Sequence, residues 1–371
     1  MKCMRTLLMS LLIAAFLTVP VCAYREEDAL SEQKDVYGLS ELEQSLPQEA
    51  IDVFSDDASG IGTEPDTYLS RILQTAGLNF GAILRESLRN VCQILLIGIL
   101  TSLLCALPCA KEQAAWTSTA GAMTAAVVGA SHASACFPQA VQVIETLSAF
   151  SGKILPALSA AAAAGGAITS AGARFAVSSL LLDLYCQFAI RFLVPFLSAF
   201  TCLVLAANVL QNDLLHSMAA LFKRMATILL IGSAVILSTL LLLTGMLHGA
   251  ADTAALKAAK AALSGALPVV GKILSDAAET VTSGAAVLCS GAGIFGIAVV
   301  TAVCIVPYLS LGAHYLLYKC MCAFCIPMSD KRFAGLLSGL ADVYATLLGT
   351  VGTISFAVYA SILSFLRAVQ T

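Results

Sequence analysis

The sequence has few charged residues and few aromatic ones. Only 12% of its 371 residues are Asp, Glu, Lys or Arg, about half the share found in ordinary soluble domains, and it has a single Trp. The net charge is −3 and no more than two basic residues occur in a row, so the chain lacks the basic surface that nucleic-acid binding needs. Hydrophobic residues make up 59% of the chain. These values predict a protein that crosses a membrane several times.

Signature motifs of common enzyme classes are missing as well. None of H-E-x-x-H, G-x-S-x-G or G-x-x-x-x-G-K-[ST] occurs, so zinc proteolysis, the hydrolase nucleophile elbow and phosphate-loop ATP binding have no signature. Asp183 and Asp342 could be proposed as paired aspartates of an intramembrane protease, but neither has a supporting motif. We therefore expect no enzymatic activity, no catalytic residue and no cofactor.

The N-terminal part has the pattern of a secretory signal. Two basic residues precede an apolar core, and small residues follow at the cleavage-site positions, so residues 1–23 are predicted to be a signal peptide. An uncleaved signal would be one more span with the same topology. Residues 24–90 are predicted to be an extracytoplasmic polar segment that ends in an amphipathic helix, 69–88. This helix is expected at the membrane surface, with packing against the spans as the alternative.

The membrane-crossing part is predicted to be all-α, because the alternating apolar and polar segments of a membrane barrel are absent. About six spans are expected, the first two of them within 91–140: 91–107, 117–137, 175–209, 226–247, 285–318 and 341–365. Segment 154–173 is apolar enough to be a seventh. Its counterpart in the second half, 267–281, is amphipathic, so both segments are expected at one face of the membrane.

One five-residue stretch occurs twice. Residues 194–198 are Val-Pro-Phe-Leu-Ser, and residues 306–310 are Val-Pro-Tyr-Leu-Ser. Each copy is preceded, at the same distance, by a Leu-Pro pair, and each is followed by a Lys-Arg pair. The pattern predicts an internal duplication, with membrane repeat 1 at 150–250 and membrane repeat 2 at 262–366.

The repeated prolines, Pro195 and Pro307, lie inside apolar runs that are too long for a single span. Proline removes a helical hydrogen bond and clashes with the preceding turn, so each run is expected to break or bend there. Asp183 and Arg191 are the strongly ionisable pair inside the first run. In the functional interpretation they line a pore or relay, and in the structural one they contact neighbouring helices.

The two Lys-Arg pairs predict the orientation of the chain. Both are expected in the cytoplasm, where loops are enriched in basic residues: Lys223, Arg224, Lys331 and Arg332. An even number of spans separates the pairs, so the two repeats are expected to be parallel, with both chain ends extracytoplasmic. Arg85 and Arg89 then lie on the outer side, against the rule.

The cysteines and histidines give little indication of a metal site. Cys320, Cys322 and Cys325 form C-x-C-x-x-C, but apart from His314 no further ligand is near in sequence, whereas a structural zinc site needs four. We expect no metal. His132, within an apolar span, is expected to make an interhelical hydrogen bond.

Several short runs in the second repeat are distinctive: 266–271 (Ala-Leu-Pro-Val-Val-Gly), 293–296 (Gly-Ile-Phe-Gly), 314–319 (His-Tyr-Leu-Leu-Tyr-Lys) and 330–332 (Asp-Lys-Arg). In these runs the chain resembles the stage III sporulation protein AE family of endospore-forming bacteria, most strongly over about 262–345. The cysteine richness is a departure from that family.

The resemblance implies a multi-pass protein of the mother-cell membrane that surrounds the forespore. It implies membership of the channel complex that links mother cell and forespore and is needed for late forespore development. The implied partners are the other stage III A-operon proteins and a forespore membrane protein, and self-association is left open. The alternative function is a permease that carries a small solute past the proline-broken helices. No transported cargo, stoichiometry or partner-contacting surface follows from the sequence.

Overall fold

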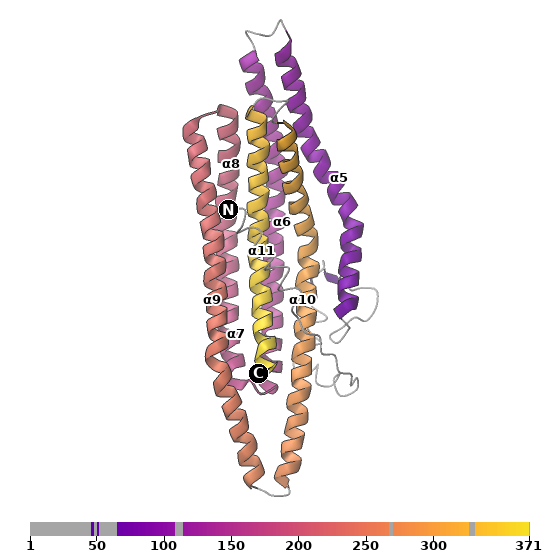
Figure 1. Ribbon diagram of the computed structural model, residues 1–371, viewed down its shortest axis with the longest axis vertical. Helices are drawn as coiled ribbons and strands as arrows, with labels where there is room; N and C mark the ends of the chain where they lie inside the picture. Colours follow the sequence, from indigo (N-terminus) through magenta and orange to yellow (C-terminus); the bar gives the residue numbers. More distant parts are fainter. Residues whose placement is uncertain are drawn as a thin grey trace.

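The computed structural model consists of long helices that pack side by side along one axis (Figure 1). It describes residues 46–47, 50–51, 65–107, 114–266, 270–325 and 331–370. The predicted signal peptide lies outside these ranges. The described helices are α5 (Pro65–Ala106), α6 (Ala114–Ala164), α7 (Ile168–Phe188), the π-helical turn η2 (Ala189–Leu193), α8 (Val194–Leu210), α9 (Asp213–Ala266), α10 (Val270–Cys325) and α11 (Lys331–Gln370). No strand occurs in the described ranges, so the all-α prediction is confirmed.

Within the described residues, six helices are long and apolar enough to cross a membrane, as the sequence predicted: Tyr68–Ala106, Trp116–Ala164, Ser170–Leu210, Asp213–Leu240, Ser283–Phe324 and Arg332–Leu366. The seventh span considered at 154–173 is not formed, and neither is a separate helix at the membrane face. Helix α6 continues through this segment to Ala164, and a turn at Gly165–Ala167 then reverses the chain. Gly166 has φ 102° in that turn, a conformation that glycine adopts without steric cost.

The amphipathic helix predicted at 69–88 is not a separate element. It is the first half of α5, which continues without interruption into the predicted first span. Tyr68 and Ile72 are buried, and the ring of Tyr68 packs edge-on against Phe295 of α10, with centroids 6.3 Å apart. The alternative that we considered for this helix, packing against the spans, is therefore the one observed.

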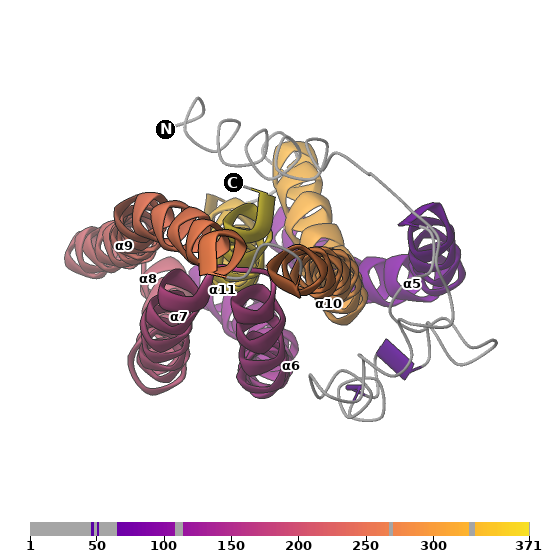
Figure 2. The same ribbon diagram turned by 90° about the horizontal axis from the view of Figure 1, so that it is seen from below.

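Helix α11 is the centre of the bundle (Figure 2). It contacts α6, α7, α8, α9 and α10. Its side chains are buried along most of its length, and large ones such as Phe333, Tyr344 and Phe365 are at most 1% exposed. Helix α5 lies at the edge of the bundle and packs on α6 and α10. The interior around α11 is therefore filled with side chains.

Pairs of contacts give the directions of the helices around α11. Helix α9 runs parallel to α11, since Lys223 contacts Asp342 and Leu230 lies beside Gly349. Helix α7 runs antiparallel to α11, because Tyr185 bonds Thr353 and Arg174 bonds Ser364. Helix α10 does the same, because Cys304 bonds Ser355 and Thr301 bonds Tyr359. The predicted parallel repeats require these directions; the duplication itself stays a prediction.

Neither repeated proline interrupts its helix. Pro307 lies inside α10, which is α-helical on both sides of it. Before Pro195 the hydrogen bonding widens to the π pattern over Ala189–Leu193, and α8 then follows directly. The predicted break is therefore not formed at either proline, and a bend stays a prediction. At Pro195 the π turn accommodates a residue that lacks an N–H and crowds the preceding turn.

Candidate functional site: a polar layer inside the bundle

His314 of α10 is the centre of a group of polar side chains buried between α5, α10 and α11. Its exposed fraction is 4%. Its Nδ1 lies 2.8 Å from the carbonyl oxygen of Ser310 and 3.1 Å from Oγ of Ser87, and its Nε2 lies 3.3 Å from Nδ2 of Asn90. Three hydrogen bonds thus connect the ring to two helices.

These contacts define the tautomer of His314. The carbonyl of Ser310 can only accept, so Nδ1 carries the proton and donates to it. The amide nitrogen of Asn90 then donates to the lone pair on Nε2. The neutral imidazole satisfies both contacts at once, and it joins α5 to α10 in one register.

Two tyrosines extend this group toward α6. The Tyr344 ring stacks on His314 with centroids 4.9 Å apart and on Tyr318 with centroids 5.3 Å apart. The thiol of Cys136 lies against the Tyr344 hydroxyl, and His132, one turn earlier on α6, is within electrostatic reach of His314. The hydroxyls of both tyrosines and Nδ1 of His132 have no geometric hydrogen-bond partner. The hydrogen bond predicted for His132 is therefore not made through Nδ1.

The unbonded hydroxyl of Tyr344 gives a testable prediction. Tyr344→Phe removes a buried hydroxyl that has no well-aligned hydrogen bond and only the Cys136 thiol and the Tyr318 hydroxyl beside it, so we expect the free energy of unfolding to rise by up to about 1 kcal/mol. The matched control is Tyr185→Phe, because the Tyr185 hydroxyl donates to Thr353 Oγ1 at 2.7 Å. That change should lower stability by about 1 kcal/mol. Thermal unfolding in detergent measures both, and a lower midpoint for Tyr344→Phe would contradict the assignment.

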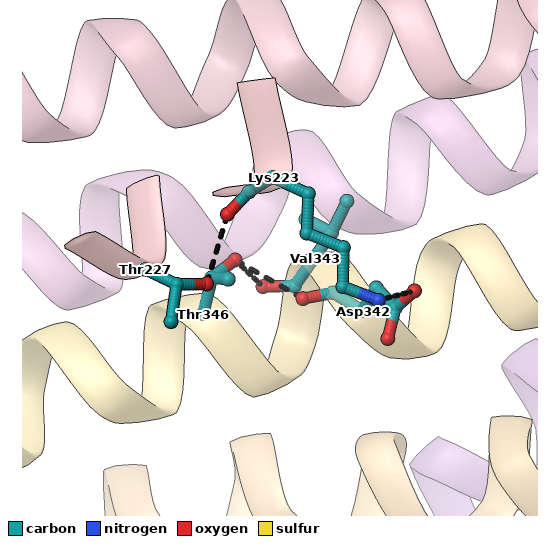
Figure 3. A network of polar contacts seen from close by, with 5 residues as sticks. All are labelled: Lys223, Thr227, Asp342, Val343 and Thr346. Carbon is teal, nitrogen blue, oxygen red and sulfur yellow. Dashed lines mark hydrogen bonds and ion pairs between the residues drawn. The ribbon is translucent and has the colours of Figure 1, made fainter. Parts of the chain in front are cut away.

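An ion pair lies on the other side of α11. Lys223 Nζ of α9 is paired with Asp342 Oδ2 of α11, and the backbone carbonyls of the same two residues accept from Thr227 and Thr346 (Figure 3). The side chains of Lys223 and Asp342 are 29% and 17% exposed. Asp342 precedes Tyr344 by two residues, so the ion pair and the His314 group form one polar layer across the bundle.

This layer also changes the positions assigned to two arginines. Arg85 and Arg89 flank the α5 residues that bond His314, and His314 is level with Asp342 and Lys223 through the layer. The sequence scheme placed the arginines on the opposite side from Lys223. That placement was wrong, because α5 is one long helix and its middle lies beside the C-terminal part of α10.

The predicted path residues are not brought together inside the bundle. Asp183, Arg191 and Pro195 are all exposed on the outward face of α7, η2 and α8, whereas Pro307 lies within α10. Asp183 accepts a hydrogen bond of 2.8 Å from Gln187 on its own helix. The expected contacts of Asp183 and Arg191 to neighbouring helices are not among the described interactions.

The predicted topology residues are at one end of the bundle. Lys223 forms the ion pair above, Arg224 is exposed, and Arg332 donates to Thr119 Oγ1 of α6. Lys331 is the first residue of α11. Whether this end faces the cytoplasm stays a prediction.

The side chains of the polar layer contact one another and hold helices together. Among the residues that the structure describes, no group of three His, Cys, Asp or Glu side chains could hold a metal ion. The His314, Lys223 and Asp342 contacts were not predicted from the sequence, because their partners are 119 to 227 residues apart. The only sequence signal was that His314 and Lys319 belong to the distinctive run 314–319.

Comparison with known families supports a single assignment. The model of a family described as stage III sporulation protein AE matches residues 62–367. No curated protein and no solved structure matches the chain.

Proposed function

The chain belongs to the stage III sporulation protein AE family, and we propose that it is a multi-pass membrane component of the channel complex that links mother cell and forespore. Family membership gives the chain a role in sporulation, and its six candidate spans make it a membrane protein. The channel role goes further than these findings. It includes a place in the mother-cell membrane around the forespore and a part in late forespore development.

The observation that favours a structural component is the filled interior of the bundle. Helix α11 occupies the centre and is buried against five neighbours. The polar layer connects helices through His314 and through Lys223 with Asp342. Such contacts fix helix register in a membrane, where polar groups are costly unless paired.

The permease alternative has less support. It requires Asp183, Arg191, Pro195 and Pro307 to line one path, and the first three are exposed on the outer surface of one chain. A structural component instead needs outward surfaces for partners. We propose as partners the other stage III A-operon proteins and a protein of the forespore membrane, and no nucleic acid.

The proposal predicts where the protein accumulates during sporulation. A fluorescent fusion expressed from the native locus should concentrate in the membrane around the forespore, and deletion should arrest late forespore development. An even distribution over all membranes, or normal spores after deletion, would contradict the proposal.

A double variant separates the two functions. A permease with Asp183→Leu and Arg191→Leu should lose spore formation while the complex still assembles. A structural component should form spores or should lose assembly together with spore formation. Co-purification of the fusion with its complex partners, compared with spore counts, distinguishes these outcomes.

A further inference from the structure

Beyond Val127, the outward face of α6 does not resemble a lipid-facing surface, whereas Trp116, Met123 and Val127 in its first part are exposed. Among the described side chains, no large hydrophobic residue between Val127 and Leu180 is exposed. The exposed positions of this face carry short or polar side chains, including Ser131, Ser134, Gln139, Gln142, Glu145 and Lys153. Yet α6 is long and apolar enough to cross a membrane.

Two other outer helices show the contrast. The exposed positions of α5 include Leu96, Leu100 and Leu103, each about 60% exposed, and those of α9 include Ile228 and Ile236. These faces suit contact with lipid chains. The small and polar face of α6 suits contact with another helix, since short side chains allow close approach in membranes.

Helix α7 adds charged side chains beside this face of α6, together with two exposed large hydrophobic residues, Leu180 and Leu184. Helices α6 and α7 lie together on one side of the bundle (Figure 2). Asp183 of α7, Arg191 of the adjoining η2 and Glu145 of α6 are all exposed. Neither Glu145 nor Arg191 has a hydrogen-bond or ion-pair partner among the described residues. An unpaired charge at membrane depth is costly.

Glu145 and Arg191 lie at similar levels along the axis of the bundle. The hydroxyl of Ser159 donates to the carbonyl of Ala171 at 3.3 Å, and Ser148 lies against Cys186, which sets the antiparallel register of α6 and α7. Counted back along α6, Glu145 is level with residues 185–189, so Arg191 is about one turn away along the axis.

The directions of the side chains close this gap. Each Cα–Cβ bond tilts toward the N-terminus of its helix, and the two helices are antiparallel. Glu145 therefore leans toward the level of Arg191, and Arg191 leans toward the level of Glu145. By the same rule Asp183 leans toward the level of Lys153.

We propose that the outward face of α6 and α7 binds a second copy of this chain through a two-fold axis along the membrane normal. Such an axis places α6 of one copy against α7 of the other without changing any height. Glu145 of each copy then pairs with Arg191 of the other, and Asp183 faces Lys153 in the same way. A closed two-fold interface contains each pair twice.

Charge exchange between two tagged copies tests the pairing. The host is a bacterium that does not sporulate, so the result is independent of the proposed function. Copies that all carry Glu145→Arg, or all carry Arg191→Glu, should co-purify at least about tenfold less than unchanged copies, because like charges then face each other. A mixture of one Glu145→Arg copy and one Arg191→Glu copy should co-purify as the unchanged chain does.

The mixture of Glu145→Arg and Arg191→Glu copies is the decisive sample. Restoration in the mixture requires a contact between copies, whereas a contact within one chain is restored only when both changes are in the same chain. Arg224→Glu, an exposed site on α9, is the matched control and should leave co-purification unchanged. The proposal is overturned if unchanged copies do not co-purify, if either single change has no effect, or if the mixture stays low.

Photo-crosslinking identifies what covers the face. A photoreactive amino acid at Ala149, on the outward face of α6, should join two tagged copies of the chain. The same amino acid at Ile228 of α9 should not. Crosslinks from position 149 to lipid or to another protein only would show that a different partner occupies this surface.

Discussion

Replacing Gly339 by Ala is expected to lower the free energy of unfolding by about 3 kcal/mol, the upper range for overpacking a tight contact. Gly335 and Gly339 form a G-x-x-x-G pair on α11 and lie directly against α8. A Cβ atom at Gly339 would be 2.1 Å from Cγ1 of Val204, and one at Gly335 would be 2.0 Å from Oδ1 of Asn208. Valine has essentially one rotamer in a helix, so Val204 cannot turn away.

The measurement is thermal unfolding in detergent, together with the fraction of protein that elutes as a single species. Gly312→Ala is the matched control, because nothing lies within 4 Å of a Cβ there. It should be neutral or slightly stabilising. Val204→Ala should restore much of the stability of Gly339→Ala, since it removes the clashing methyl. If Gly339→Ala unfolds like Gly312→Ala, the close packing of α8 on α11 is not as described.

Replacing Asp342 by Leu is expected to lower stability by about 2 kcal/mol, less than for a fully buried pair because Lys223 and Asp342 keep some access to solvent. The change leaves the Lys223 ammonium between α9 and α11 without its counter-ion. The cost is therefore that of an unpaired charge in a region of low dielectric constant.

The double variant Lys223→Met with Asp342→Leu separates the charge from the packing. It removes both charges and keeps the side-chain volume, so stability should return to within about 1 kcal/mol of the unchanged chain. Arg224→Met, at the exposed neighbouring position, should have no effect on the unfolding midpoint. Equal destabilisation by the single and double variants would mean that the pair contributes through shape alone.

The extent of each helix was less predictable than the number of spans. Apolar runs mark the parts of the chain that can enter a bilayer, and all six were found. Helix α10 has 56 residues, about 84 Å at 1.5 Å per residue, far more than the hydrocarbon core of roughly 30 Å. Segment 69–88 is amphipathic, and 154–164 is apolar enough to be interpreted as part of a separate span, so hydropathy did not connect either segment with the adjacent span.

The outward position of Asp183 and Arg191 could not be predicted for a different reason. Between Leu180 and Val194 most of the residues around Asp183 and Arg191 are apolar, so this stretch has no polar side from which to infer which face points inward. The same applies to His314, whose run resembled a known family while its bonded partners on α5 remained unknown. Contacts between residues more than 100 positions apart leave no local pattern.

The sequence alone determined that this protein is a helical membrane protein with six candidate spans and that it resembles a sporulation family. It could do so because hydropathy and family motifs are local properties of the chain. The tertiary structure decided which helix lies at the centre, which charges meet and which face is left outward. These features depend on helix packing, such as the close approach of α8 at Gly339 and the ion pair of Asp342 with Lys223. Each requires a partner residue that is distant in sequence.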